Sequence, residues 1–200
     1  MKKKRVGVRL FKAFVLCILL LGIVGVAAGG VFVKHVIDNT PEVTAKDILP
    51  QGYTTSIVDQ NGTVLEQLKD SDSNRVYKKY DEISKYMGDA FVAIEDERFY
   101  KHNGIDLQGI IRAGVVGVTH GFHFTEGAST LTQQLIKNNV FPNFVNETNS
   151  ERFERKIQEQ YLALKIEKQM SKKEILEAYM NTINLGQGCL GVQTAAKRYF

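Results

Sequence analysis

Two glutamates stand among residues that could give them chemical roles. Glu95 comes directly after an apolar run that includes Phe91 and Ile94. A carboxylate beside a buried apolar segment loses hydration, which disfavours its charged form. We therefore expect the pKa of Glu95 to be raised toward the range that suits a general base. The alternative interpretation is that Glu95 belongs to a group of ordinary helix-end acids that pair with Arg98 and Lys101.

The second glutamate, Glu159, lies among cations. Arg155 and Glu159 have the i, i+4 spacing that places two side chains on the same side of a helix, and Lys156 is beside them. Opposite charges should keep this carboxylate ionised, and the same cations could neutralise a phosphate group. The alternative is a solvated salt bridge, which would contribute at most about 1 kcal/mol to stability.

A polar segment from Glu126 to Val140 lies between the two glutamates. Thr130 and Gln133 have the spacing of a capping box and predict the start of a helix. Leu131 and Leu135 should face a core, and the opposite side would carry polar groups near a helix N-terminus. That side could bind an anionic, oxygen-rich ligand such as a sugar pyrophosphate, or it could simply be solvated. Its residues are Thr130, Gln133, Gln134 and Lys137.

The elements that position these groups should be helices, because the pattern becomes helical from Asp81 onward. The helix that carries Phe91 should stop at Gly104, and Asp106 is placed to cap a further helix from Leu107 to about Val118. Another helix should follow a capping box at Thr148 and bury an apolar stripe. The residues of that stripe are Phe153, Ile157, Tyr161 and Leu164.

Two more helices are predicted near the end of the sequence. Ser171 begins a third capping box, and the helix behind it should bury Ile175, Leu176 and Tyr179. In the last segment Gly188 and Gly191 precede Ala195-Ala196, which favours a helix in close contact with a neighbour.

The N-terminal segment has the pattern of a membrane anchor. Residues 1–12 hold six basic residues and no acid, and residues 13–33 hold no charge. The uncharged run has the length that a bilayer requires, whereas the apolar region of a cleaved signal peptide spans only about 7–15 residues. We therefore expect a cytoplasmic tail over 1–12 and a single transmembrane helix over 13–33, with the rest outside the cell. Cleavage near Ala28 is the alternative.

Residues 34–80 should form a linker that contains a β-hairpin. Thr54–Asp59 and Thr63–Leu68 are rich in residues that favour strands, and Asn61-Gly62 between them is a strong hairpin signal. No comparable pair of strand-like segments follows Asp81, so the sequence predicts a mostly α-helical protein.

Other classes of site have weaker support. The basic N-terminal run lies against an apolar segment, so membrane topology explains it better than nucleic-acid binding does. Cys17 lies in the membrane run and Cys189 outside it, so no disulfide between them is expected. His120 and His123 are close in sequence but have no carboxylate or thiol at metal-ligand spacing, so no metal site is expected.

Five motifs in a fixed order are more specific than any of these features. They are EDERFYKHNG, GASTLTQQLIKN, RKIQE, KKEILEAYMN and GCLGVQTAAKRYF. In this order they resemble the five sequence blocks of the peptidoglycan glycosyltransferases, the transglycosylase domains of class A penicillin-binding proteins and their monofunctional relatives. The resemblance covers roughly residues 81–200. It implies a mostly α-helical, lysozyme-like domain with a cleft, partly embedded in the outer leaflet and C-terminally incomplete at Phe200.

The resemblance also implies an activity. Members of this family polymerise lipid II: the 4-hydroxyl of an acceptor disaccharide attacks the anomeric carbon of the growing chain, undecaprenyl pyrophosphate leaves, and the configuration inverts to a β-1,4 bond. The expected partners are lipid II, the growing glycan strand and the bacterial cell membrane, together with other cell-wall synthesis and division proteins. No organic cofactor is expected, and a divalent cation on the pyrophosphate is left open.

The family's residue roles transfer by motif position. Glu95 would be the general base, and Glu159 would assist departure of the pyrophosphate directly or through neighbouring cations. Lys137, Arg155 and Lys156 would neutralise the pyrophosphate. The residues that would bind sugar and phosphate oxygens are Ser129, Gln133 and Gln134. The residues that would support these segments are Asp96, Phe99, His102 and Asn181.

One departure puts a role in doubt. Many family members have an arginine four residues before the Arg-Lys pair, whereas here that position is Glu151 and the arginine is Arg152. Two rival functions also remain. A wall-cleaving enzyme of the lysozyme type would use a glutamate in a helical cleft but needs no cations at a pyrophosphate. A non-catalytic, membrane-anchored wall-binding protein is the other.

Overall fold

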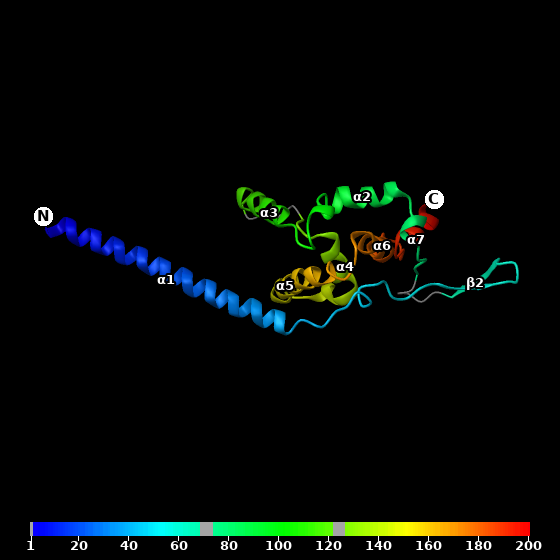
Figure 1. Cartoon of the computed structure of the whole chain (residues 1–200), viewed down its shortest axis with the longest axis horizontal. Coiled ribbons are helices and arrows are strands. Elements are labelled where there is room, and N and C mark those ends of the chain that lie inside the picture. Colours follow the sequence, from blue (N-terminus) through cyan, green and yellow to red (C-terminus); the bar gives the residue numbers. More distant parts are fainter. Residues whose placement is uncertain (1, 69–73, 122–126) are drawn as a thin grey trace. The chain divides into compact units, whose positions relative to one another are not determined.

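The computed structural model describes residues 2–68, 74–121 and 127–200 (Figure 1). The chain divides into two compact units, Met1–Pro41 and Glu42–Phe200. The helices and strands are α1 (Lys2–Asp38), β1 (Thr55–Val58), β2 (Val64–Leu68), η1 (Tyr80–Glu82), α2 (Lys85–Glu95), η2 (Phe99–Lys101), α3 (Leu107–Thr119), α4 (Leu131–Val140), η3 (Phe144–Asn146), α5 (Asn149–Ile166), α6 (Lys172–Thr182) and α7 (Val192–Tyr199).

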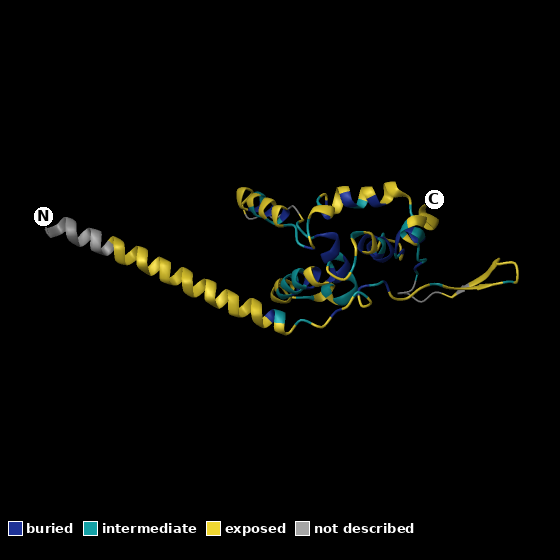
Figure 2. Cartoon of the chain, in the orientation of Figure 1, coloured by how far each residue is buried: buried dark blue, intermediate teal, exposed yellow. Residues whose placement is uncertain are grey.

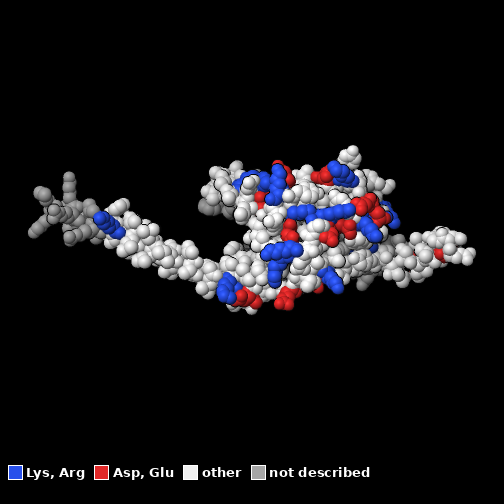
Figure 3. All heavy atoms as spheres, viewed as in Figure 1, with Lys and Arg blue, Asp and Glu red and all other residues white. Residues whose placement is uncertain are grey.

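The first unit consists mainly of one long helix, α1. Its stretch Phe11–Asp38 has 28 residues and a mean hydropathy of 2.7, so it is long and apolar enough to cross a membrane. Much of α1 carries no charged atoms on its surface (Figure 3). The helix continues past Val33, the predicted end of the span, to Asp38, which accepts a hydrogen bond of 2.6 Å from Lys34.

The second unit begins with the predicted hairpin. Strands β1 and β2 pair in antiparallel fashion, with a register shift after Ile57. Asp59 holds the loop, since its side chain accepts the N–H groups of Asn61 and Thr63 at 2.8 Å each. Gly62 has a φ of 82°, a left-handed conformation that glycine adopts without steric cost. The Asn-Gly signal therefore predicts the hairpin correctly.

The core of the second unit is built around α4, which packs against both α5 and α6 (Figures 1 and 2). Leu131 and Leu135 of α4 are fully buried, as the leucine spacing predicts, and so is Ile136. The capping boxes at Thr148 and Ser171 are also confirmed. Fully buried partners from the flanking helices are Leu162, Ala163 and Ile166 of α5 and Ile175, Leu176 and Tyr179 of α6.

The predicted apolar stripe of α5 is wrong. Phe153 is 61% exposed and Leu164 is 42% exposed, whereas the buried side of the helix begins with Arg155 and Glu159 and continues with Leu162. Apolar periodicity finds a buried face only when that face is apolar, and here the buried face includes the charged residues Arg155 and Glu159. The charged pair of α5 is therefore part of the interior.

The segment after α2 also differs from the prediction. The helix ends at Glu95 rather than at Gly104, because the next residue, Asp96, accepts a hydrogen bond from the backbone of Leu131 and turns the chain toward α4. Ile94 is 81% exposed instead of buried. Gly104 has a φ of 92°, and a Cβ there would lie 2.8 Å from the Ala163 carbonyl, so close packing against α5 requires glycine.

Helices α3 and α7 follow their sequence signals. Asp106 caps α3 by accepting the N–H of Gly109 at 3.0 Å, as predicted. The exposed side chains of α3 include Leu107, Ile111, Val115 and Val118. The predicted close contact before α7 is at Gly191, where a Cβ would lie 2.9 Å from the Asn181 carbonyl oxygen.

Candidate active site

Glu95, the predicted general base, lies at the last residue of α2 and is exposed. The loss of hydration expected from the preceding apolar run is therefore absent, because the neighbouring Ile94 points to solvent as well. Gln134 of α4 donates a hydrogen bond from Nε2 to Glu95 Oε2 at 2.9 Å. The carboxylate is thus available to a ligand and is held from one side by a side-chain amide.

Asp96, the next residue, joins α2 to the start of α4. Its buried carboxylate accepts the backbone N–H of Leu131 at 3.0 Å, and a carboxylate is favoured at a helix N-terminus. His102 Nε2 lies 2.9 Å from the same carboxylate, and His102 Nδ1 accepts the N–H of Gly104 at 3.1 Å. Because Nδ1 is an acceptor, the ring donates from Nε2 to Asp96. Phe99 is fully buried beside this turn.

Glu159, the second predicted carboxylate, is fully buried among cations. Arg155 Nη1 donates to one carboxylate oxygen, and Lys156 Nζ donates to the other at 2.7 Å. Lys156 also donates to Ser129 Oγ at 3.1 Å. The ion pair in α5 is therefore connected to the segment that leads into α4.

Glu147 is a member of this group that sequence reasoning missed. It accepts hydrogen bonds from Arg155 Nε, at 2.7 Å, and from Arg155 Nη2, and Arg152 Nε lies 3.2 Å away. Bonding to Arg155 lowers the pKa of the Glu147 carboxyl to about 2. No spacing rule indicates this contact, because Glu147 precedes the α5 helix and reaches Arg155 from outside it. The same contact gives the exposed Arg152, whose role the sequence leaves in doubt, a partner.

Lys137 completes the cationic group from α4. Its ammonium lies 4.8 Å from the centre of the Phe144 ring, and the Arg155 guanidinium lies 5.7 Å from the same ring. Burial, followed by the charge of Lys156, lowers the pKa of Lys137. The charges that act on Lys137 are those of Lys156 and Arg155, which lower its pKa, and of Glu159 and Glu147, which oppose them, so an anion beside Lys137 would be stabilised by three cations.

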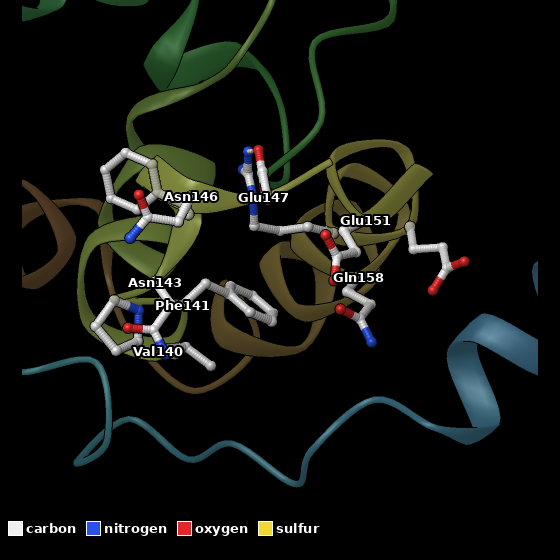
Figure 4. A pocket seen from close by; sticks show the side chains of 11 residues that line it. Val140, Phe141, Asn143, Asn146, Glu147, Glu151 and Gln158 are labelled. Carbon is white, nitrogen blue, oxygen red and sulfur yellow. Dashed lines mark hydrogen bonds and ion pairs between the residues drawn. The ribbon is translucent and has the colours of Figure 1, made fainter. Parts of the chain in front are cut away.

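Two cavities adjoin these groups. One, of about 110 Å³, is lined by Glu95, Asp96 and Ser129. The other, of about 460 Å³, is lined by Arg155, Glu147 and the loop between α4 and α5. Figure 4 shows this second cavity, with Phe141 and Asn143 on one side and Glu151 and Gln158 on the other. Glu95 therefore lines the first cavity and Arg155 lines the second.

Comparison with known proteins places this geometry in a family. The family model for the transglycosylase domain matches residues 61–200. The chain belongs to the transglycosylase family. It is similar to penicillin-binding protein 1A of Clostridium perfringens (strain 13 / Type A), with 42% identity over 195 residues that cover 96% of this chain and 28% of that protein. It is also similar to penicillin-binding protein 1A/1B of Bacillus subtilis (strain 168), with 35% identity over 198 residues, 99% of this chain and 21% of that protein.

The match bears on the predictions in two ways. The recognition of a class A penicillin-binding protein transglycosylase domain is confirmed, and so is the fold class: mostly α, with a small antiparallel hairpin and an N-terminal apolar helix. The chain spans less than a third of the length of either relative. The activity of the whole protein is therefore a proposal.

Some residues expected to bind substrate have protein partners in the transglycosylase domain. Gln133 is buried rather than on an exposed polar face: its Nε2 donates to the Gly104 carbonyl at 3.2 Å, and its Oε1 accepts the N–H of Thr130 at 3.3 Å. Asn181, which is expected in a supporting role, is also buried and exchanges two hydrogen bonds of 2.8 Å with the backbone of Lys78. Contact of Gln133 with substrate stays a prediction.

The transglycosylase domain shows no group of three metal-ligating side chains among the residues that the structure describes. His120 is exposed, and His123, its expected companion, lies outside the described residues. Cys17 and Cys189 are free thiols.

Proposed function

We propose that this domain is a peptidoglycan glycosyltransferase that polymerises lipid II into β-1,4-linked glycan strands and releases undecaprenyl pyrophosphate with inversion. The observation that carries the proposal is the cationic group formed by Lys137, Arg155 and Lys156 around buried Glu159. A leaving pyrophosphate develops negative charge, and cations fixed in advance stabilise it without rearrangement. Membership of the transglycosylase family supports the substrate class.

In the proposed reaction the acceptor's 4-hydroxyl oxygen attacks the anomeric carbon of the donor chain. Its proton passes to the Glu95 carboxylate, which is exposed at the end of α2 and able to meet a substrate hydroxyl. The bond between the anomeric carbon and the pyrophosphate oxygen breaks, and its electrons leave with the pyrophosphate. Attack opposite the leaving group inverts the configuration. Ser129 lines the same cavity as Glu95 and is placed to bind sugar or phosphate oxygens.

Glu159 supports departure of the pyrophosphate through its neighbours. Its carboxylate is fully buried, and its two hydrogen-bond donors are Arg155 and Lys156. It therefore orients the cations instead of meeting the substrate itself. The protein groups supply positioning and charge, so an organic cofactor has no step to perform. A divalent cation on the substrate pyrophosphate would add to the same stabilisation.

A membrane location fits the lipid substrate. We propose that α1 is a single-pass anchor with its basic end in the cytoplasm and the domain on the outer side of the bacterial cell membrane. The exposed apolar side chains of α3, Leu107, Ile111 and Val115 among them, suit contact with acyl chains. Protease added outside intact cells should remove the domain and leave a short membrane peptide; a mature protein that begins after Ala28 would contradict the anchor.

The test of the function is chain growth from labelled lipid II by the full-length protein and its Glu95→Gln variant. The amide keeps the shape of the side chain but cannot take a proton, so polymerisation should fall by at least about 10²–10⁴-fold while lipid II still binds. A folded Glu95→Gln protein that polymerises at nearly the normal rate would show that the base is another group. Solubilisation of finished cell wall without consumption of lipid II would favour the lysozyme-type alternative, and wall binding without either reaction would favour a binding protein.

A further inference from the structure

A chain of two hydrogen bonds connects the proposed base to the core of the domain. Tyr179 of α6 donates its hydroxyl to Gln134 Oε1 at 3.1 Å, and Gln134 Nε2 donates to Glu95 Oε2 at 2.9 Å. The three residues come from α6, α4 and α2. Tyr179 is fully buried, Gln134 is half-buried and Glu95 is exposed, so the chain runs from the interior to the surface.

We propose that Tyr179 is a positioning residue for the base: its hydroxyl selects the orientation of the Gln134 amide that presents N–H, rather than oxygen, to Glu95. This inference rests on the proposed role of Glu95 and extends it to a fully buried residue.

The orientation of the Gln134 amide has to be selected because its two ends differ chemically. A glutamine side chain has nearly the same shape in its two flipped orientations, but only one of them places the NH₂ group toward Glu95. The other would place a carbonyl oxygen against a carboxylate, and two acceptors repel. Because the Tyr179 hydroxyl donates to Oε1, the NH₂ group is directed to Glu95.

Tyr179 is suited to act as a constant donor. Burial raises the pKa of its hydroxyl, and the charge of Glu95 adds to this effect, so the group keeps its proton at neutral pH. Its ring is fixed by an edge-to-face contact with Phe91, with the ring centres 5.5 Å apart. That contact uses the ring and not the hydroxyl, so removal of the hydroxyl alone leaves the packing in place.

The base needs such support because of its position. Glu95 is the last residue of α2, and its side chain is exposed. An N–H donor favours the ionised form of a carboxylate, which is the form that accepts a proton. Other charged groups line the same cavity; they are Asp96, Glu97, Arg98, Asp106 and Arg112. None of these is changed in the variants below, so their influence cancels in the comparison.

The test compares Tyr179→Phe with Tyr199→Phe in the full-length protein. Tyr199 also donates its hydroxyl to a protein oxygen, the Leu185 carbonyl at 3.0 Å, and therefore controls for loss of one tyrosine hydrogen bond. For Tyr179→Phe we expect kcat of lipid II polymerisation to fall about 3- to 10-fold, and the acidic limb of the pH–rate profile to move to higher pH, because an ionised carboxylate has lost its donor. Tyr199→Phe should leave the profile unchanged.

A double-mutant cycle separates positioning from a structural effect. If Tyr179 acts only through the amide, Tyr179→Phe should have no further effect on kcat in a Gln134→Ala background. Equal effects of Tyr179→Phe with and without Gln134, or an unchanged pH profile in a folded Tyr179→Phe protein, would overturn the proposal. If Tyr179→Phe does not fold, the unaltered protein provides the test by NMR: the Gln134 NH₂ protons should show contacts to the Glu95 side chain, and contacts to the Tyr179 hydroxyl end instead would overturn the proposal.

Failure of this proposal can be told apart from failure of the proposed function. An inactive Glu95→Gln variant with an unchanged Tyr179→Phe profile would leave Glu95 as the base and remove Tyr179 from its support. An active Glu95→Gln variant would remove the base assignment itself, and the proposal with it.

Discussion

The ion pairs around Arg155 lead to a quantitative prediction for Glu159→Gln. Removing one partner of a buried ion pair usually costs about 3–5 kcal/mol, because an uncompensated charge stays in the interior. Here Arg155 keeps a second carboxylate, Glu147, which accepts from its Nε and Nη2. Lys156 keeps Ser129 and is 39% exposed, so water can solvate it. The remaining cost is the loss of charge-assisted hydrogen bonds, about 1.5–3 kcal/mol.

Thermal melting of the full-length protein and its variants measures this cost. A loss of 1.5–3 kcal/mol corresponds to a fall in Tm of roughly 3–12 °C for a domain of this size. In a Glu147→Gln background the same Glu159→Gln change should lower Tm further than it does alone, because Arg155 then has no carboxylate left among these two partners. Simple additivity of the two changes would refute the idea that the carboxylates share Arg155, and a single-variant loss above about 5 kcal/mol would show that Glu147 does not compensate.

Three further predictions concern charge and backbone geometry. Lys137→Ala should weaken binding of lipid pyrophosphates far more than binding of plain disaccharides in direct binding assays, since a charge-assisted contact contributes roughly 1.5–3 kcal/mol; equal losses would indicate a structural role. The pKa of Glu147 is lowered to about 2, so its contribution to stability is present above about pH 4.5 and is lost as the pH falls toward 2; acid unfolding of Glu147→Gln should lack this component. Gly104→Ala should destabilise the domain by at least about 1–3 kcal/mol in chemical unfolding, because its φ is 92° and its Cβ would meet Ala163, whereas Gly114→Ala, with no atom within 4 Å, should not.

The sequence predicts the local parts of the fold well. The capping boxes at Thr130, Thr148 and Ser171 and the Asn-Gly hairpin depend on residues a few positions apart, and the structure has all of them. Features that depend on contacts between distant segments are predicted less well. Burial of the Arg155–Glu159 pair depends on the segments packed against α5, and apolar periodicity alone assigned that helix the wrong buried face.

In the candidate site, too, the sequence indicates individual residues but not the contacts that form between distant segments. Motif order identifies Glu95 and Glu159, but it does not indicate that one is exposed and the other fully buried. Glu147 carries no motif signal, because its contact with Arg155 forms only once the loop before α5 is folded. The polar side of α4 is likewise only partly available to a ligand. Gln133 is used in the capping box, and the Gln134 amide bonds to Glu95 and Tyr179.

The unequal burial of α2 and α4 has a consequence for motion. Helix α2 has two buried residues, Gly88 and Val92, whereas α4 has five. Segments with few buried contacts open at lower free energy than the rest of a domain, so amide hydrogens of α2 should exchange faster than those of α4. The proposed base lies on the first of these helices, and Lys137 lies on the second. In the proposed mechanism the base would therefore lie on the helix that opens more readily, and Lys137 on the helix that opens less readily.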